Sequence, residues 1–191
     1  MTVTAVHIAH MFIKDFVKSG DIVIDATAGN GKDTLFLSTL IGNSGTIISI
    51  DIQKEAINRT QQLIAKHNPK SNVLYVCDSH EHIGKIAQDY QHQISCIVFN
   101  LGYLPGADNT IYITKKDSTL KAIRSSIQIL NNRGILCVIA YRGHIGGLEE
   151  YEAIEQFMET LEPHIWHVIK SEAINQTNTA PIVLLASKRT Y

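Results

Sequence analysis

The chain has 191 residues, enough for one well-filled hydrophobic core and short of two ordinary domains. Hydrophobic residues make up 45% and charged residues 18%, a composition that excludes a disordered protein. The sequence contains no run of about eighteen apolar residues, so it does not indicate a membrane-spanning helix. The formal net charge of −1 does not favour a nucleic-acid-binding protein, although a local basic patch suffices for phosphate contacts.

Apolar strand-like runs alternate with helical patterns along the whole chain, which is typical of a parallel sheet covered by helices. The pattern predicts a first helix over residues 2–18, with one apolar face made by Ala5, Ile8, Ala9, Phe12, Ile13 and Phe16. Further helices are expected at 32–41, 54–67, 81–89, 118–130 and 148–161. Strands are expected at 21–25, 45–51, 72–77, 94–99, 134–140, 166–173 and 181–187.

The last two predicted strands are separated only by residues 174–180. That segment is too short for a helical crossover, so these two strands should be antiparallel. The pattern therefore predicts a Rossmann-like α/β fold: a mostly parallel seven-stranded sheet with a C-terminal antiparallel hairpin and helices on both faces. This arrangement resembles the fold of class I methyltransferases. It differs in this hairpin from the dehydrogenases. We expect a single domain over residues 1–191.

The cysteines and histidines do not indicate a metal site. No CxxC spacing is present, and each cysteine lies in an apolar run, so we expect three small core residues at Cys77, Cys96 and Cys137. The histidine pairs bring no third ligand at metal-site spacing, namely His7 with His10 and His80 with His82. The first residues lack the pattern of a signal peptide, so we expect a cytoplasmic protein.

A cofactor site is expected where the first three strands end, because ligands bind at the carboxyl ends of the strands in such sheets. The turn after the first strand contains Gly29-Asn30-Gly31, and glycine lets the backbone approach a ligand closely. A dinucleotide fingerprint fails at Thr34 and a P-loop fails at Asp33. A tight turn with acidic helix caps is the structural alternative.

An acidic residue at a strand end followed by GxG resembles motif I of the methyltransferases, which implies S-adenosylmethionine (SAM) as cofactor. The resemblance places Gly29 and Gly31 against the amino-acid part of SAM, Asp51 on the ribose and Asp78 near the adenine amine. The expected cofactor-binding residues are Asp25, Gly29, Asn30, Gly31, Asp33, Asp51, Gln53, Asp78, Ser79 and Asn100.

A candidate catalytic segment, Asn100-Leu101-Gly102-Tyr103, follows the fourth strand. It resembles the (Asp/Asn)-Pro-Pro-(Tyr/Phe) signature of methyltransferases that modify exocyclic amines, with Leu-Gly in place of Pro-Pro. An Asn oxygen accepts amine hydrogens and an aromatic ring stacks on a base, so we expect these roles for Asn100 and Tyr103. A glycine turn with a packing tyrosine is the alternative.

The segment over residues 141–150 follows the fifth strand and opens at the same edge. His144 can position the substrate or act as a base near neutral pH, although a structural histidine is the competing interpretation. Glu149 and Glu150 begin a helix, where negative charge is favourable, and need no catalytic role. The expected substrate- or RNA-binding residues are Tyr103, Lys115, Lys116, Tyr141, Arg142 and His144.

Three stretches together, DATAGNGKDTLFL, FNLGYLPG and YRGHIGGLEE, resemble the YtqB-like rRNA methylases, the MnmM family of bacterial tRNA 5-aminomethyl-2-thiouridine methyltransferases. The resemblance covers nearly the whole chain. It implies methyl transfer from SAM to the aminomethyl nitrogen of the tRNA wobble uridine, with the anticodon stem-loop as partner and no metal. Arg142 departs from the proline of a Y-P-G-H pattern, and we expect an exposed cation there that contacts phosphate or is only tolerated.

Other functions stay open on the sequence alone. An enzyme of the same fold could methylate rRNA or a small-molecule amine, and a catalytically silent SAM-binding module is a second alternative. A dehydrogenase is a third and weaker one. The sequence does not fix the oligomeric state, although a homodimer would extend the RNA-binding surface of so small a chain.

Overall fold

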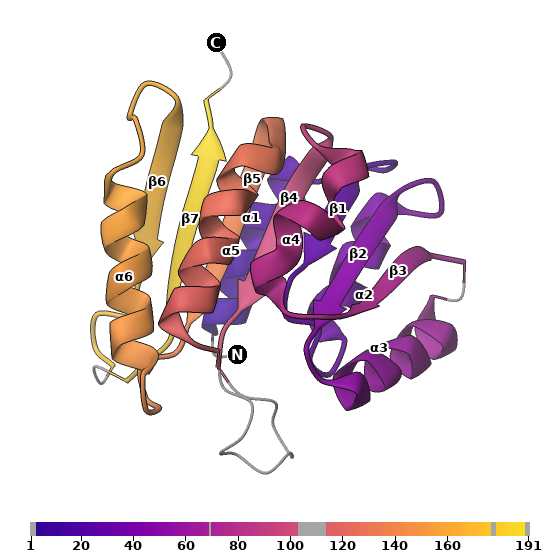
Figure 1. Ribbon diagram of the computed structural model, residues 1–191, viewed down its shortest axis with the longest axis horizontal. Helices are drawn as coiled ribbons and strands as arrows, with labels where there is room; N and C mark the ends of the chain where they lie inside the picture. The colour runs from indigo at the N-terminus through magenta and orange to yellow at the C-terminus, as the bar shows by residue number, and fades with distance from the viewer. Residues whose placement is uncertain (1–2, 69, 103–113, 177–178, 190–191) are drawn as a thin grey trace.

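The computed structural model describes residues 3–68, 70–102, 114–176 and 179–189. Its centre is a seven-stranded sheet in the order β3-β2-β1-β4-β5-β7-β6 (Figure 1). The strands are β1 (Ile22–Asp25), β2 (Thr46–Asp51), β3 (Asn72–Cys77), β4 (Ile94–Asn100), β5 (Leu130–Ala140), β6 (Trp166–Ser171) and β7 (Ile182–Lys188). β1 to β5 pair in parallel, and β7 pairs antiparallel with both β5 and β6, which confirms the predicted C-terminal hairpin.

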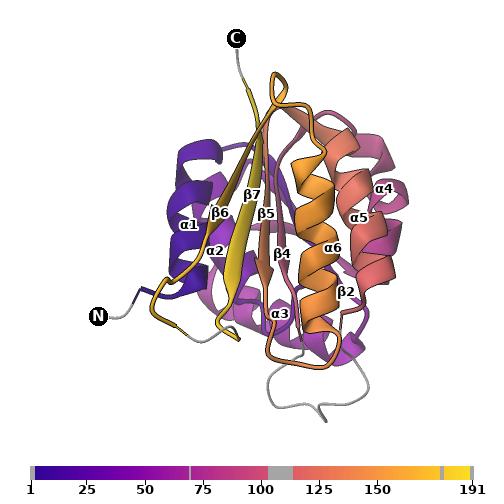
Figure 2. The same ribbon diagram turned by 90° about the vertical axis from the view of Figure 1, so that its left-hand side faces the viewer.

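Helices cover both faces of the sheet, as Figure 2 shows. One apolar core lies between the sheet and α1 (Ala5–Phe16) and α2 (Lys32–Ile41), and α3 (Lys54–His67) packs beside α2. The other lies under α4 (Ile83–Ile86), α5 (Lys116–Ile129) and α6 (Gly147–Glu159). This two-faced burial explains why β4 is buried along nearly its whole length, as are residues 134–140 of β5.

The local patterns determine some element boundaries closely, whereas β5 begins at Leu130 and not at residue 134. α2, α3 and β3 have the bounds that the sequence predicts. Thr4 caps α1 by accepting a hydrogen bond from the backbone N–H of His7, so this helix begins at Ala5 and not at residue 2. None of the helices in the described ranges is long and apolar enough to cross a membrane.

Two expectations about the third strand and its neighbourhood were wrong. The helix predicted over residues 81–89 is instead three short pieces, a 3-10 turn at His80–His82, α4, and a second 3-10 turn at Gln88–Tyr90. Cys77 is exposed, whereas Cys96 and Cys137 are buried. β3 is the edge strand of the sheet, so an apolar run there does not imply burial on both faces.

Candidate functional site

The glycine turn between β1 and α2 is built around left-handed backbone. Gly31 has φ 78° and immediately precedes α2, and a Cβ added to it would lie 2.9 Å from Cα of Thr60 on α3. Only glycine satisfies both the backbone angle and this close approach. One side of the turn therefore packs against α3. The turn itself lies at the edge of the sheet where the parallel strands end.

Asp25 lies beneath this turn and not at its surface. Its side chain is fully buried, and its carboxylate accepts hydrogen bonds from the hydroxyl of Thr34 at 2.6 Å and the backbone N–H of Thr27 at 3.2 Å. Burial, together with the nearby negative charge of Asp33, raises the pKa of Asp25 to about 7. The geometry gives Asp25 the role of holding the turn together, which is a different role from the expected contact with a cofactor.

Asp51 is the carboxylate that the structure joins directly to the glycine turn. One of its oxygens accepts the backbone N–H of Gly29 at 2.9 Å, and the other accepts that of Gln53 at 2.9 Å. Burial raises the pKa of Asp51, and these two hydrogen bonds oppose the shift. A fixed carboxylate beside Gly29 at the end of β2 fits the binding of a ribose diol, as the sequence predicts.

Asp78 continues the same edge at the end of β3. Its backbone N–H donates to the carbonyl of Asp51 at 3.1 Å. Its carboxylate accepts hydrogen bonds from the ring of His82 at 3.0 Å and the backbone of Ser79 at 2.7 Å. The bond from His82 lowers the pKa of Asp78, so the carboxylate is ionised at neutral pH. A surface hollow of about 310 Å³ lies against this group and is lined by Asp78, His82, Lys85, Ile86 and Gln88.

Asn100 ends β4 and is anchored through both its backbone and its side chain. The backbone N–H donates to the hydroxyl of Thr27 at 2.7 Å, and the side-chain Nδ2 donates to Asp33 Oδ2 at 2.9 Å. The other oxygen of Asp33 is 2.7 Å from Nε2 of His10 on α1. Asp33, expected to bind the cofactor, is thus turned toward Asn100. No signal in the sequence had connected His10 to this site.

The segment after β5 meets the catalytic segment at Gly102. A Cβ added to Gly102 would lie 3.8 Å from Tyr141 and 3.9 Å from His144 Nε2. The Nδ1–H of His144 donates to the carbonyl of Ile145 at 3.1 Å, which leaves Nε2 as a hydrogen-bond acceptor. Within the described ranges this buried Nε2 has no hydrogen-bond partner. Tyr103 itself lies outside the described residues.

Glu150 lies in the first turn of α6, as the sequence predicts, and it is 2% exposed. Its carboxylate accepts hydrogen bonds from the hydroxyls of Thr114 at 2.8 Å and Thr119 at 2.6 Å. Thr114 in turn accepts the backbone N–H of Gly102 at 3.1 Å and donates its own N–H to the Gly102 carbonyl at 3.2 Å. Burial raises the pKa of Glu150. This network fixes residues 102 and 114 next to each other.

The expectation that Arg142 is an exposed cation was wrong. Its side chain is 11% exposed and pairs with Glu172 at 2.6 Å, and it also donates to the carbonyl of Ala180 at 3.2 Å. The guanidinium lies 5.4 Å from the centre of the Tyr151 ring. Arg142 therefore ties the loop after β5 to the hairpin, through an ion pair that a proline at this position could not form.

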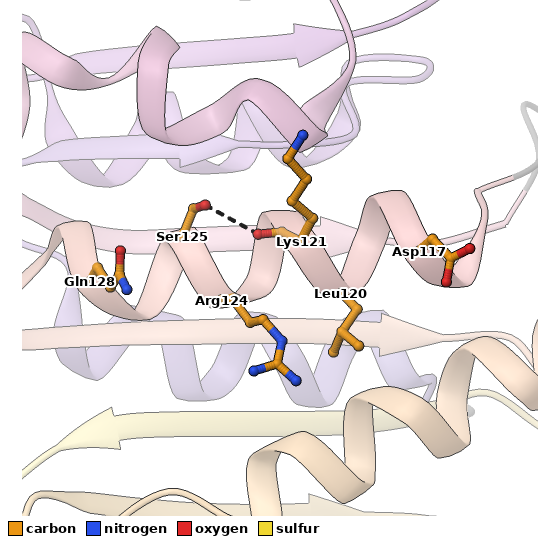
Figure 3. A pocket seen from close by; sticks show the side chains of 6 residues that line it. All are labelled: Asp117, Leu120, Lys121, Arg124, Ser125 and Gln128. Atoms are coloured by element: carbon orange, nitrogen blue, oxygen red, sulfur yellow. Dashed lines mark hydrogen bonds between the residues drawn. The ribbon is translucent and has the colours of Figure 1, made fainter.

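Basic side chains lie on α5 and at the residue before it, in two groups. Lys115 and Lys116 are exposed at the start of the helix, beside the catalytic segment. Farther along, Lys121 is 3.6 Å from Glu81, and Arg124 lies 4.5 Å from the centre of the Phe157 ring. Both of these line a shallow hollow of about 330 Å³ with Asp117, Leu120, Ser125 and Gln128 (Figure 3). The first group is the one that lies at the edge where the strands end.

Comparisons with known proteins agree with this geometry. A family model described as "Putative rRNA methylase" matches residues 47–187, and a model of protein-L-isoaspartate O-methyltransferases matches residues 1–87. A chloroplastic tRNA (mnm5s2U34)-methyltransferase from Arabidopsis thaliana is 34% identical over 97% of this chain and 69% of its own length.

Two solved structures are similar along their whole length. One is described as a putative rRNA-methylase from Clostridium thermocellum, with a TM-score of 0.92, 34% identity and coverage of 99% of this chain and 100% of that one. The other is described as a putative methyltransferase from Streptococcus mutans in complex with SAH, with a TM-score of 0.85, 31% identity and the same coverage.

Proposed function

This chain belongs to the rRNA methylase family of SAM-dependent methyltransferases, and from that premise we propose that it methylates the aminomethyl nitrogen of 5-aminomethyl-(2-thio)uridine at the tRNA wobble position. The observation that carries this proposal is the orientation of Asn100. Its Nδ2 is engaged by Asp33, so its Oδ1 is left to accept a hydrogen from a substrate amine. The Arabidopsis relative is named for a tRNA base, which favours tRNA over rRNA.

The residues at the strand ends fit SAM. Gly29 and Asp51 are joined by a hydrogen bond, and Asp78 lies next to Asp51, so a backbone turn and two carboxylates converge along one edge. In the proposal the turn lies against the amino-acid part of SAM, Asp51 binds the ribose and Asp78 the adenine amine. When bound, SAM supplies a methyl group already activated by its sulfonium, so no metal is needed.

The residues of the chain must prepare the amine. An alkylammonium has a pKa near that of lysine, roughly 10.4, so it is almost fully protonated at neutral pH and has no free lone pair. A desolvated pocket favours the neutral amine. Nε2 of His144 is buried, has no hydrogen-bond partner among the described residues and lies beside Gly102, so we assign it the uptake of the amine proton. Asn100 Oδ1 then holds a remaining N–H and directs the lone pair.

The RNA would be held by residues around this edge. Lys115 and Lys116 contact phosphates in the proposal, Tyr141 contacts the substrate, and Tyr103 stacks on the base. The anticodon stem-loop as the bound element stays a prediction, as do the homodimer, the single domain and the cytoplasmic location.

The reaction is tested by mass spectrometry of tRNA nucleosides. The purified protein is incubated with SAM and with tRNA from cells that lack the gene. Conversion of 5-aminomethyl-2-thiouridine to its methylated form is the expected result. Methylation of rRNA from the same cells, with none in tRNA, would contradict the assigned substrate and leave the methyltransferase assignment in place.

Asn100→Ala tests the site within the same assay. We expect kcat to fall on the order of 10²-fold, because the amine is no longer oriented, while the Kd for SAM measured by calorimetry changes less than about twofold. Asn132→Ala, at an exposed position near the start of β5, is the matched control and should retain full activity. Equal losses of turnover and SAM affinity in Asn100→Ala would argue against its assignment.

A further inference from the structure

A chain of hydrogen bonds runs from the first helix into the proposed catalytic residue. His10 Nε2 on α1 lies 2.7 Å from Asp33 Oδ1, and Asn100 Nδ2 lies 2.9 Å from Asp33 Oδ2. The side chain of Asp33 is 7% exposed and that of His10 is 21% exposed. Residues from α1, α2 and β4 therefore meet at one nearly buried carboxylate.

A carboxylate between two such partners determines which way the Asn100 amide faces. An ionised Asp33 can only accept hydrogen bonds, so the NH2 group of Asn100 must face it and the Oδ1 atom must face away. The two ends of an amide have nearly the same shape, so without this partner Asn100 could present its NH2 group to the substrate instead. An NH2 group facing an amine cannot accept the amine's hydrogens.

His10 fixes Asp33 in turn. The His10 ring stacks on Phe36 of α2 with centroids 3.6 Å apart and an interplanar angle of 3°. The neighbouring residues Ala9 and Ile13 are fully buried, so α1 is firmly packed on the sheet. Because one oxygen of Asp33 is held by this ring, the carboxylate cannot rotate away from Asn100.

We propose that His10 and Asp33 are positioning residues that lock the Asn100 amide with its oxygen toward the substrate amine. This inference rests on the proposed function, since it assumes that Asn100 receives an amine. It gives α1 a role in catalytic turnover, although this helix belongs neither to the glycine turn nor to any of the strand ends.

The competing explanation is that His10 only attaches α1 to α2, and substitutions distinguish the two. His10→Leu keeps an apolar side chain against Phe36 but removes the donor, and we expect kcat to fall about tenfold with the Kd for SAM and the melting temperature nearly unchanged. His10→Gln retains an N–H at a similar reach and should recover most of the loss. His7→Leu, the same change at an exposed position of α1, is the control and should be fully active.

A double-mutant cycle shows whether His10 acts through Asn100. In the Asn100→Ala background, His10→Leu should lower kcat less than about twofold, because no amide is left to orient. The same tenfold loss in both backgrounds would overturn the proposal, and so would equal activities of His10→Leu and His10→Gln.

A second measurement does not depend on activity. The side-chain NH2 resonances of Asn100, identified by their disappearance in Asn100→Ala, should shift in His10→Leu and stay in place in His7→Leu. Unchanged resonances in His10→Leu would overturn the positioning role. An absence of methylated tRNA in the wild-type assay would instead contradict the proposed function, so the two failures are distinguishable.

Discussion

The carboxyl group of Asp25 is a fully buried acid that organises the glycine turn after β1. It receives hydrogen bonds from Thr27 and Thr34, and Thr34 also bonds Ser49 at 2.9 Å, so the first two strands and the turn converge on it. Complete burial disfavours its ionised form, and the negative charge of Asp33 adds to the effect. The group is therefore suited to a structural role and unsuited to facing water or a ligand.

This burial makes a prediction about pH. The pKa of Asp25 is about 7 in the folded protein against an ordinary value of 3.8, so the folded state retains a proton that the unfolded state has lost. The favourable contribution of the protonated Asp25 to the free energy of unfolding is therefore complete below pH about 4. It is lost progressively as the pH rises to about 7. Asp25→Asn, which cannot ionise, should therefore gain a few degrees in melting temperature relative to wild type between pH 5 and pH 8.

The measurement is a pair of thermal melts at each pH. Asp15→Asn, at an exposed position of α1, is the control, and its melting temperature should follow that of the wild type. Parallel curves for Asp25→Asn and the wild type would mean that Asp25 is ionised in the folded protein at pH 5.

At the scale of elements, α3 packs closely against the glycine turn between β1 and α2. Gly31→Ala would add the strain of a left-handed backbone, about 1–2 kcal/mol, and force the new Cβ against Thr60. We expect a lower melting temperature and weaker SAM binding, because α3 must move away from the turn.

Gly146→Ala separates the two costs. Gly146 has a similar φ of 81°, but no atom lies within 4 Å of an added Cβ, so this variant carries only the backbone strain. Thermal melts should show the larger loss for Gly31→Ala. Equal losses would show that the packing against α3 is unimportant.

At the scale of the whole molecule, the net charge of −1 requires that RNA be attracted by a local patch. Lys115 and Lys116 supply two exposed charges beside the catalytic segment. Reversing both to Glu should weaken tRNA binding and reduce the slope of log K against log salt by about one for each phosphate that is no longer bound. The Kd for SAM should not change.

The control is a variant of the same net charge with the change made elsewhere. Lys66→Glu with Lys70→Glu alters exposed residues at and beyond the C-terminal end of α3, away from the strand ends that form the site. Gel shifts or anisotropy over a salt series would compare the two. If both double variants bind tRNA equally weakly, the overall charge matters and the patch does not.

The sequence by itself determined the fold class, the order of the strands along the chain and the position of the glycine turn after the first strand. These depend on local information: the period of apolar residues, the glycines in one turn, and a link of seven residues that is too short for a crossover. The sequence also predicted that the acids at the ends of β2 and β3 lie along one edge of the sheet, because parallel strands end at a common edge.

Only the tertiary structure decided which of these side chains face the site. Asp25 and Asp51 look alike in the sequence, but one is buried under the turn and the other bonds Gly29 at the edge. Arg142 looked exposed until the hairpin brought Glu172 to it. The bonds from Asp33 to His10 and Asn100 span 23 and 67 residues, and such contacts arise from packing between layers, which no local pattern encodes.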